Sequence, residues 1–248
     1  MKLRAVTFDF WGTLLLDGPS SDNRYKRRRM GDFETVLKGV GVTASPTALD
    51  RAYDESGAWL NRFWAANRDV PVDEHVRAIL AALDRDLPGR LPADVLAALV
   101  DAYARPALLV PPSVDGGALG ALEQLAGRGL ALGLVSNTMR TPGATLRKLL
   151  EKFRLLRCFQ ALTFSDEVGV RKPDPEIFAR TLAALGVEAA AAVHVGDDAV
   201  LDVQGARAAG MRAVQVTSAS LKALGARRPD AAVPSLATLP EAIARLDG

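Results

Sequence analysis

The spacing of hydrophobic residues divides the chain into two parts of different character. A short apolar run over 3–8 predicts a buried strand, and from about residue 115 apolar runs alternate with helical patterns. Between about 17 and 110 we find no comparable strand, and the apolar residues recur at helical spacing. These helical rows are Phe33, Val36, Leu37 and Val40; Trp59, Leu60, Phe63 and Trp64; Val76, Ile79, Leu80 and Leu83; and Val95, Leu96, Leu99 and Val100.

The second part reads as a series of strand–helix units. Such an alternation implies an α/β protein whose parallel sheet is covered by helices on both faces. We therefore predict one α/β core, made of residues 1–16 and 111–248, with an all-helical domain of residues 17–110 inserted after the first strand. The predicted strands are 130–135, 161–164, 191–195 and 212–216, and the predicted helices are 118–126, 145–153, one starting at Asp174-Pro175, and 198–209.

The composition excludes several classes of protein. The net charge of +2 is too small for a strongly basic nucleic-acid binder. One cysteine excludes an intramolecular disulfide and a multi-cysteine zinc site, and two histidines exclude a histidine-rich metal site. No apolar run approaches the roughly 18 residues of a membrane span, and we expect no signal peptide, because the apolar stretch after Met1 ends at Asp9. We expect a cytoplasmic protein, monomeric or homodimeric, with neither nucleic acid nor membrane as a partner.

Polar side chains stand where four of the predicted strands end. The carboxyl ends of parallel strands share one edge of a sheet, and ligands bind there. We therefore expect these side chains to lie close together. In chain order they are Asp9 with Gly12-Thr13; Ser136-Asn137-Thr138; Ser165-Asp166 with Arg171-Lys172; and Asp197-Asp198 with Asp202.

This set of side chains favours phosphoryl chemistry around a hard cation. A concentration of carboxylates without Cys or His ligands is typical of Mg²⁺. Lysine and hydroxyl or amide donors suit an anionic group such as phosphoryl, and an aspartate can be the nucleophile. Singly, each residue has a structural explanation: Asp9 and Ser136-Asn137 as turns, Lys172 as a solvated charge, Asp198 as a helix-dipole partner. The joint pattern favours a site.

The motifs resemble those of the haloacid dehalogenase-like hydrolase superfamily with an inserted helical cap. The resemblance covers the whole α/β part and implies a Rossmann-like core sheet, with the inserted segment as the cap. Four segments carry it, in the order that the family has them: Val6-Thr7-Phe8-Asp9-Phe10-Trp11-Gly12-Thr13-Leu14; Leu134-Val135-Ser136-Asn137-Thr138; Val168-Gly169-Val170-Arg171-Lys172-Pro173-Asp174-Pro175; and His194-Val195-Gly196-Asp197-Asp198 through Asp202-Val203-Gln204-Gly205-Ala206.

The resemblance also implies a role for each matching residue. Asp9 corresponds to the nucleophile, Ser136 to a residue that holds the transferred group, and Lys172 to the cation that offsets its charge. Asp197 is the strongest metal candidate, and Asp198 or Asp202 would orient metal-bound water. The implied catalytic residues are thus Asp9, Ser136 and Lys172; the substrate-binding ones Trp11, Thr13, Ser136, Asn137 and Lys172; and the Mg²⁺ ligands Asp9, Trp11 through its backbone carbonyl, Asp197, Asp198 and Asp202.

Trp11 departs from the family's pattern. Most phosphatases of the superfamily have an aspartate there, which protonates the leaving oxygen, and an indole cannot do so. Three hypotheses follow. We favour a Mg²⁺-dependent phosphatase that acts on a small phosphorylated metabolite through an aspartyl-phosphate on Asp9. The alternatives are a metal-independent 2-haloacid dehalogenase, whose family members have a tyrosine at this position, and a catalytically silent phospho-ligand-binding protein.

The inserted segment offers less specific signals. For the basic run from Arg24 to Arg29 we favour a solvated helix face over contact with an anionic substrate. For Trp59, Phe63 and Trp64 we favour the core of the cap over an aromatic substrate wall. Within the predicted core, we interpret His194 as a hydrogen-bonded histidine of a buried strand.

Overall fold

The first strand of the chain lies in the middle of the main sheet. The computed structural model describes residues 2–18, 21–217 and 228–247, and its main sheet has six parallel strands in the order β5-β4-β1-β6-β7-β8. Because β1 has β4 on one side and β6 on the other, the strand order reverses at β1, which is where such sheets bind ligands. The strands are β1 (Ala5–Phe8), β4 (Ala131–Ser136), β5 (Ala161–Phe164), β6 (Ala192–Gly196), β7 (Arg212–Val216) and β8 (Ala231–Val233).

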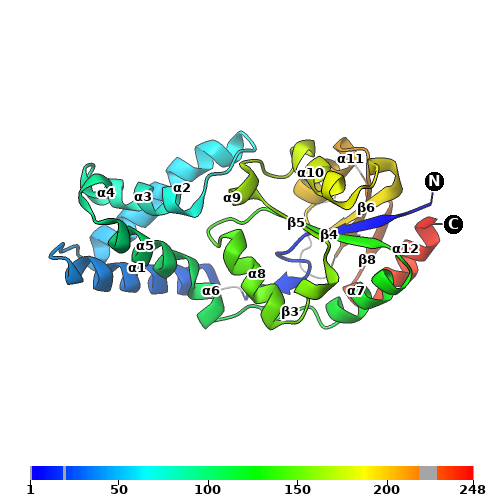
Figure 1. Ribbon diagram of the computed structural model, residues 1–248, viewed down its shortest axis with the longest axis horizontal. Coiled ribbons are helices and arrows are strands. Elements are labelled where there is room, and N and C mark those ends of the chain that lie inside the picture. Colours follow the sequence, from blue (N-terminus) through cyan, green and yellow to red (C-terminus); the bar gives the residue numbers. More distant parts are fainter. Residues whose placement is uncertain (1, 19–20, 218–227, 248) are drawn as a thin grey trace.

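Helices cover both faces of this sheet, as the alternating pattern predicts (Figure 1). Side chains of successive strand residues point to opposite faces, so Val6 and Phe8 of β1 join one hydrophobic cluster while Ala5 joins another. One face carries α7 (Ala118–Gly127), α8 (Gly143–Lys152) and α12 (Leu239–Asp247); the other carries α10 (Pro175–Leu185), η3 (Ala199–Gln204) and α11 (Gly205–Ala208). The predicted start of α10 is confirmed, because Asp174 accepts a hydrogen bond from the N–H of Glu176.

The insertion after β1 is helical and has its own hydrophobic cluster, which includes Phe33, Leu49, Ile79 and Tyr103. Two of the predicted helical rows lie in α3 and α5 as expected, and a third lies in α1 except for Val40, which follows the end of that helix and is exposed. The expectation that the aromatic residues at 59, 63 and 64 fill this core is wrong, because all three are only partly buried and none belongs to the cluster, which α2 joins through Leu49, Ala52 and Tyr53. The helices are α1 (Ser21–Gly39), α2 (Pro46–Ala65), α3 (Val72–Leu83), α4 (Leu87–Arg90), α5 (Ala93–Ala104) and α6 (Pro106–Leu109).

Two short strands bracket the insertion. The antiparallel pair β2 (Leu15–Leu16) and β3 (Ser113–Val114) joins the chain that leaves the core to the chain that returns. We call the helices α1–α5 the cap; the division of the chain at residues 17 and 110 stays a prediction. Among the described helices, none combines the length and hydrophobicity needed to cross a bilayer. The remaining short elements are η1 (Leu156–Cys158), α9 (Ser165–Val168), η2 (Ala189–Ala191) and η4 (Leu236–Thr238).

Candidate active site

Asp9 lies at the carboxyl edge of the sheet, directly after β1. Its backbone N–H donates to the carbonyl of Val195 in β6 at 2.9 Å, which fixes the start of the loop. The loop then turns at Gly12, whose φ is +78°. A Cβ at Gly12 would lie 2.7 Å from the carboxyl group of Asp197, so only glycine lets the loop pass this close to the end of β6.

Lys172 is held between two of the carboxylates. Its Nζ donates to Asp9 at 2.5 Å and to Asp202 at 2.7 Å, and its side chain is 2% exposed. The side-chain amide of Asn137, just after β4, fixes the backbone of the lysine: Oδ1 accepts from the Lys172 N–H at 2.9 Å, and Nδ2 donates to the Lys172 carbonyl at 3.1 Å. Asn137 therefore positions Lys172 through the main chain.

Asp202 in turn is fixed from three sides. Its Oδ2 accepts from the N–H of Asp198 at 2.9 Å, and its Oδ1 bonds Lys172 and, at 3.2 Å, Nε2 of His194. The other nitrogen of His194 bonds the hydroxyl of Thr7 at 2.8 Å, so the interpretation of this histidine as a hydrogen-bonded core residue is confirmed. Burial lowers the pKa of His194, which keeps the ring neutral.

The charges of this cluster do not balance. Burial, together with the charges of Asp202 and Asp197, raises the pKa of Asp9 to about 8 against the opposing effect of Lys172. Burial works against the charged form of Lys172, yet Asp202 and Asp9 outweigh it and raise the pKa of the lysine to about 12. Burial also opposes ionisation of Asp202, but Lys172 and His194 lower the pKa of its carboxyl strongly. Without a further cation the nucleophile candidate Asp9 is therefore largely protonated at neutral pH.

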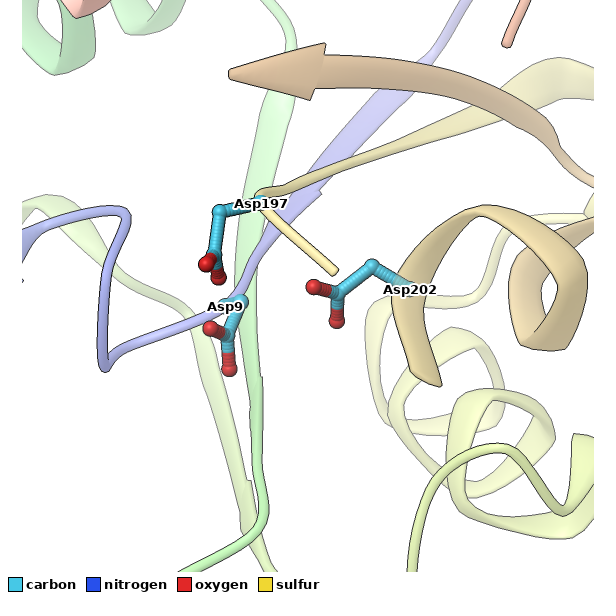
Figure 2. A group of neighbouring side chains, drawn as sticks. All are labelled: Asp9, Asp197 and Asp202. Atoms are coloured by element: carbon cyan, nitrogen blue, oxygen red, sulfur yellow. The ribbon is translucent and has the colours of Figure 1, made fainter. Parts of the chain in front are cut away.

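Three carboxylates converge at the edge of the sheet, from the ends of β1 and β6 and from η3 (Figure 2). One oxygen of each of Asp9, Asp197 and Asp202 lies within 4.8 Å of the others, close enough for one metal ion. Asp198 lies outside this group of three, because its side chain caps η3 by accepting from Val200 N at 2.8 Å and Leu201 N at 2.9 Å. A hard cation fits this all-oxygen donor set and its excess negative charge.

A cavity of about 480 Å³ opens onto the cluster. Trp11 forms part of its wall and packs edge-to-face on Phe10, with the ring centroids 4.9 Å apart. Thr13 and Ser136 are fully buried and are not part of this wall; the hydroxyl of Ser136 donates to the carbonyl of Asn137 at 3.4 Å, and that of Thr13 meets no partner among the described residues. The wall consists of Asp9, Trp11, Gly12, Leu16, Asp17, Asn137, Met139, Lys172, Asp197, Asp198, Leu201 and Asp202.

The cap reaches the site through Asp69, a residue that the sequence analysis missed. Its buried carboxylate accepts from Arg171 at 2.7 Å, from the hydroxyl of Ser165 at 2.5 Å and from the indole of Trp64 at 3.0 Å. The main chain adds an antiparallel bridge, with Asp69 N donating to Gly169 O at 3.1 Å. The cap loop is thus bonded to the segment just before Lys172. No local sequence pattern predicts these contacts, because Ser165 and Arg171 lie 96 and 102 residues from Asp69.

The basic run of α1 is only partly solvated. Arg24, Arg27 and Arg28 are exposed, but Arg29 is 2% exposed and points into the contact between the cap and the core. The interpretation of the whole run as a solvated face is therefore wrong for Arg29. Helical periodicity assigns Arg29 to the same face as Tyr25, which is also buried, so the spacing did contain this signal.

Comparison with known proteins gives consistent results. A sequence model described as haloacid dehalogenase-like hydrolase matches residues 3–210. A glyceraldehyde 3-phosphate phosphatase of Methanopyrus kandleri is 29% identical over 92% of this chain and 90% of its own length. A phosphoserine phosphatase of Thermus thermophilus is 45% identical, but the match spans 36% of this chain and only 34% of that protein. The structure of a 2-haloacid dehalogenase from Pseudomonas syringae covers 98% of this chain and 99% of its own, with a TM-score of 0.70 and 23% identity, which supports the fold.

Proposed function

The chain belongs to the haloacid dehalogenase-like hydrolase family, and we propose that it hydrolyses small phosphate monoesters with Mg²⁺ as cofactor. The observation that carries this proposal is the cluster of Asp9, Asp197 and Asp202, two of which bond Lys172, placed where the strand order reverses. The two relatives compared above are both phosphatases, which supports the same reaction class.

In the proposed reaction Asp9 is the nucleophile. Its carboxylate attacks phosphorus, the bond from phosphorus to the ester oxygen breaks, and an aspartyl-phosphate forms. Water then attacks the phosphorus, which releases phosphate and restores Asp9. Lys172 lies against Asp9 and offsets the negative charge that accumulates on the phosphoryl oxygens, while Asp202 and Asn137 keep the lysine in place. Ser136 and Thr13 are the proposed partners of the phosphoryl oxygens.

The donor set supports Mg²⁺ as the cation. Asp9, Asp197 and the backbone carbonyl of Trp11 would hold it, and Asp202 and Asp198 would orient its water ligands. When bound, the ion supplies positive charge that keeps Asp9 ionised and neutralises the phosphoryl group. Gly12 supports this assignment, because its lack of a side chain leaves the space beside Asp197 free.

Trp11 restricts the leaving groups that we expect the protein to handle. Its ring has no proton of suitable acidity to give to the departing oxygen. The departing group must therefore leave as a stable anion or take its proton from water. We propose that acyl and aryl phosphates, whose leaving oxygens are weakly basic, are hydrolysed faster than alkyl phosphates.

The test is steady-state hydrolysis of 4-nitrophenyl phosphate with and without Mg²⁺ and with Asp9→Asn. We expect that removing the nucleophile lowers kcat by about 10³-fold or more and that chelation abolishes turnover. The matched control is Asp94→Asn, which removes an exposed carboxylate of the cap. Turnover that survives Asp9→Asn unchanged would end the proposal.

Trp11 favours a second candidate function, metal-independent 2-haloacid dehalogenation. An aromatic residue at this position is shared with the dehalogenases that the motifs resemble. Halide release from a 2-haloacid in excess chelator would establish this reaction. The carboxylates of Asp197 and Asp202 beside Asp9 argue for the first candidate, because such a concentration of negative charge favours a bound cation. If phosphate analogues raise the melting temperature but neither substrate turns over, the chain is a phospho-ligand-binding protein.

A further inference from the structure

A second cavity, of about 470 Å³, lies between the cap and the core beside the candidate active site. The two cavities share Trp11, Asp17 and Met139 in their walls, so a molecule bound at Asp9 can extend past the indole into the second cavity. We call this second space the cap cavity. Helices α1 and α2 and the loop 138–141 form most of its wall.

Two guanidinium groups define the inner end of the cap cavity. Arg29 is 2% exposed and donates to the carbonyls of Tyr103 and Arg140 at 2.8 and 2.7 Å and to the Tyr53 hydroxyl at 3.0 Å. Arg140 enters from the core loop, lies 3.9 Å above the ring of Tyr53, and donates to Tyr53 O at 3.1 Å and to the hydroxyl of Ser56 at 3.3 Å. All of these acceptors are uncharged.

Neither guanidinium has a counter-ion within the described part of the chain. No carboxylate there pairs with Arg29 or Arg140. The three acidic residues of the cavity wall make other contacts or face solvent. Asp54 pairs with Lys26 at 2.8 Å, and Asp17 accepts from the hydroxyl of Tyr25 at 3.2 Å. Asp22 is exposed in the first turn of α1. The buried positive charge of Arg29 and the partly buried one of Arg140 are therefore left without an anion.

We propose that the cap cavity binds a carboxylate carried by the leaving group of the substrate, with Arg140 as its principal partner. The substrate class is then a phosphate monoester with a carboxylate, bound with its phosphoryl group at Asp9 and its other charged end at the two arginines. This inference rests on the proposed function. Arg140 is the available partner because no acceptor among the described residues meets its Nε–H, and a guanidinium binds a carboxylate in a fork of two hydrogen bonds.

The walls of the cap cavity suit a flat molecule. Trp11, Tyr53 and Trp64 contribute aromatic rings to the cavity wall. An aryl group stacks favourably on such side chains, and it is also a leaving group that tolerates the lack of a proton donor at position 11. Trp11 therefore favours an aryl phosphate for two reasons: its ring can stack on the aryl group, and its lack of an acidic proton matters least for such a leaving group.

Gly57 of α2 keeps the position of Arg140 open. A Cβ at residue 57 would lie 2.7 Å from Nη2 of Arg140. Gly57→Ala therefore displaces the guanidinium while leaving its charge in the protein. This variant therefore tests whether the position of the Arg140 guanidinium matters, since the positive charge itself is retained. The substitution lies in α2 and does not alter the residues around Asp9.

The experiment compares 4-carboxyphenyl phosphate with 4-carbamoylphenyl phosphate, whose leaving groups differ in charge but little in size. We expect the wild type to have a KM about 10-fold to 100-fold lower for the carboxylate, the range of a charge-assisted hydrogen bond. Arg140→Gln should abolish this preference, Arg140→Lys should retain part of it, and Gly57→Ala should reduce it. The control Arg180→Gln removes an exposed arginine of α10 and should leave the preference unchanged.

A binding measurement separates this inference from the proposed reaction. Calorimetric titration with 4-carboxybenzylphosphonate and 4-carbamoylbenzylphosphonate needs no turnover. Preferential binding of the carboxylate that depends on Arg140 supports the cap cavity even if no phosphate ester is hydrolysed. Equal KM values in an active enzyme, or a preference that persists in folded Arg140→Gln, overturn it while leaving the hydrolase function intact. If Arg140→Gln does not fold, Gly57→Ala decides between the same two outcomes.

Discussion

The two adjoining cavities carry opposite surpluses of charge. On the core side, three carboxylates are grouped together and two of them contact one ammonium group, whereas at the inner end of the cap cavity two guanidinium groups meet only uncharged oxygens. A third buried contact, between Asp69 and Arg171, is balanced. This comparison distinguishes buried charges that are neutralised within the protein from buried charges that need a ligand to neutralise them. A balanced pair needs nothing further, while each surplus implies a partner of opposite sign, a cation in one cavity and an anionic group in the other.

Lys172→Met is the most severe way to disturb this balance, because it leaves three buried carboxylates with no ammonium group. We expect at least a 10³-fold loss of kcat and a loss of about 3–5 kcal/mol in the free energy of unfolding in chelator. Added Mg²⁺ should restore part of the stability but not the turnover. Urea unfolding with and without Mg²⁺ measures this, with the exposed Lys148→Met as the control; a variant as stable as that control contradicts the charge argument.

Trp11→Asp changes the wall that the two cavities share. The new carboxyl group supplies the missing proton donor, so we expect kcat for an alkyl phosphate to rise by about 10²-fold, with a much smaller gain for 4-nitrophenyl phosphate. Trp11→Phe is the matched control, since it shortens the ring system without adding an acid. A fall in kcat for both esters would mean that the indole itself takes part in the native reaction.

Asp166 provides a buried carboxylate that belongs to neither cavity wall described above. Burial raises its pKa to about 6, although the N–H of Gly143 donates to its carboxylate at 3.2 Å. A raised pKa in the folded state means that this group favours folding below pH 4 and that the benefit is lost as pH rises through 6. We therefore expect Asp166→Asn to be about 2 kcal/mol more stable than wild type at pH 7.5.

The same variant should show no advantage at low pH. Urea unfolding at pH 7.5 and at pH 4 measures the difference, because the neutral aspartic acid and the asparagine are then equivalent in charge and both accept from Gly143. A stability difference that stays constant between the two pH values would refute the assignment of the shift to Asp166.

Asp197→Asn is the mildest change, because it reduces the surplus of negative charge beside Asp9. In chelator we expect a gain of about 1 kcal/mol, or roughly 2–4 °C in the melting temperature for a chain of this size. With Mg²⁺ the wild type should be the more stable of the two, since it can bind the ion through a carboxylate that the variant lacks. Thermal scans in chelator and in Mg²⁺, with Asp94→Asn as the control, distinguish relief of the repulsion between Asp197 and Asp9 from a general effect of removing a charge.

The regular parts of the fold were predictable from the sequence because their patterns are local. The strands at 161–164 and 212–216 match their predicted bounds, and Asp174 caps its helix as expected. The two-residue strands β2 and β3 were missed, because such short strands exist only through their pairing. The predicted helix over 198–209 is instead a π-helical segment, capped by Asp198 and followed by α11, and no local pattern in the sequence distinguishes it from an α-helix.

The candidate site was predictable only as far as strand ends determine it. Asp9, Asp197 and Asp202 follow from the rule that parallel strands end at one edge, and the structure brings them together. The contacts between the cap and the core were not predictable in the same way. Arg29, Arg140 and Asp69 act through partners that are distant along the chain, so periodicity can indicate that a residue is buried without indicating what it contacts.

The bridge from the cap loop to the segment before Lys172 has a consequence for recombination between relatives. A cap grafted from another family member would bring its own loop in place of Asn67–Asp69, while the recipient would keep the strand partner at 169–171. A functional chimera therefore has to inherit both sides of this junction from the same parent. The helical insertion and the segment 169–172 must therefore be exchanged together, although Asp69 and Arg171 lie 102 residues apart in the sequence.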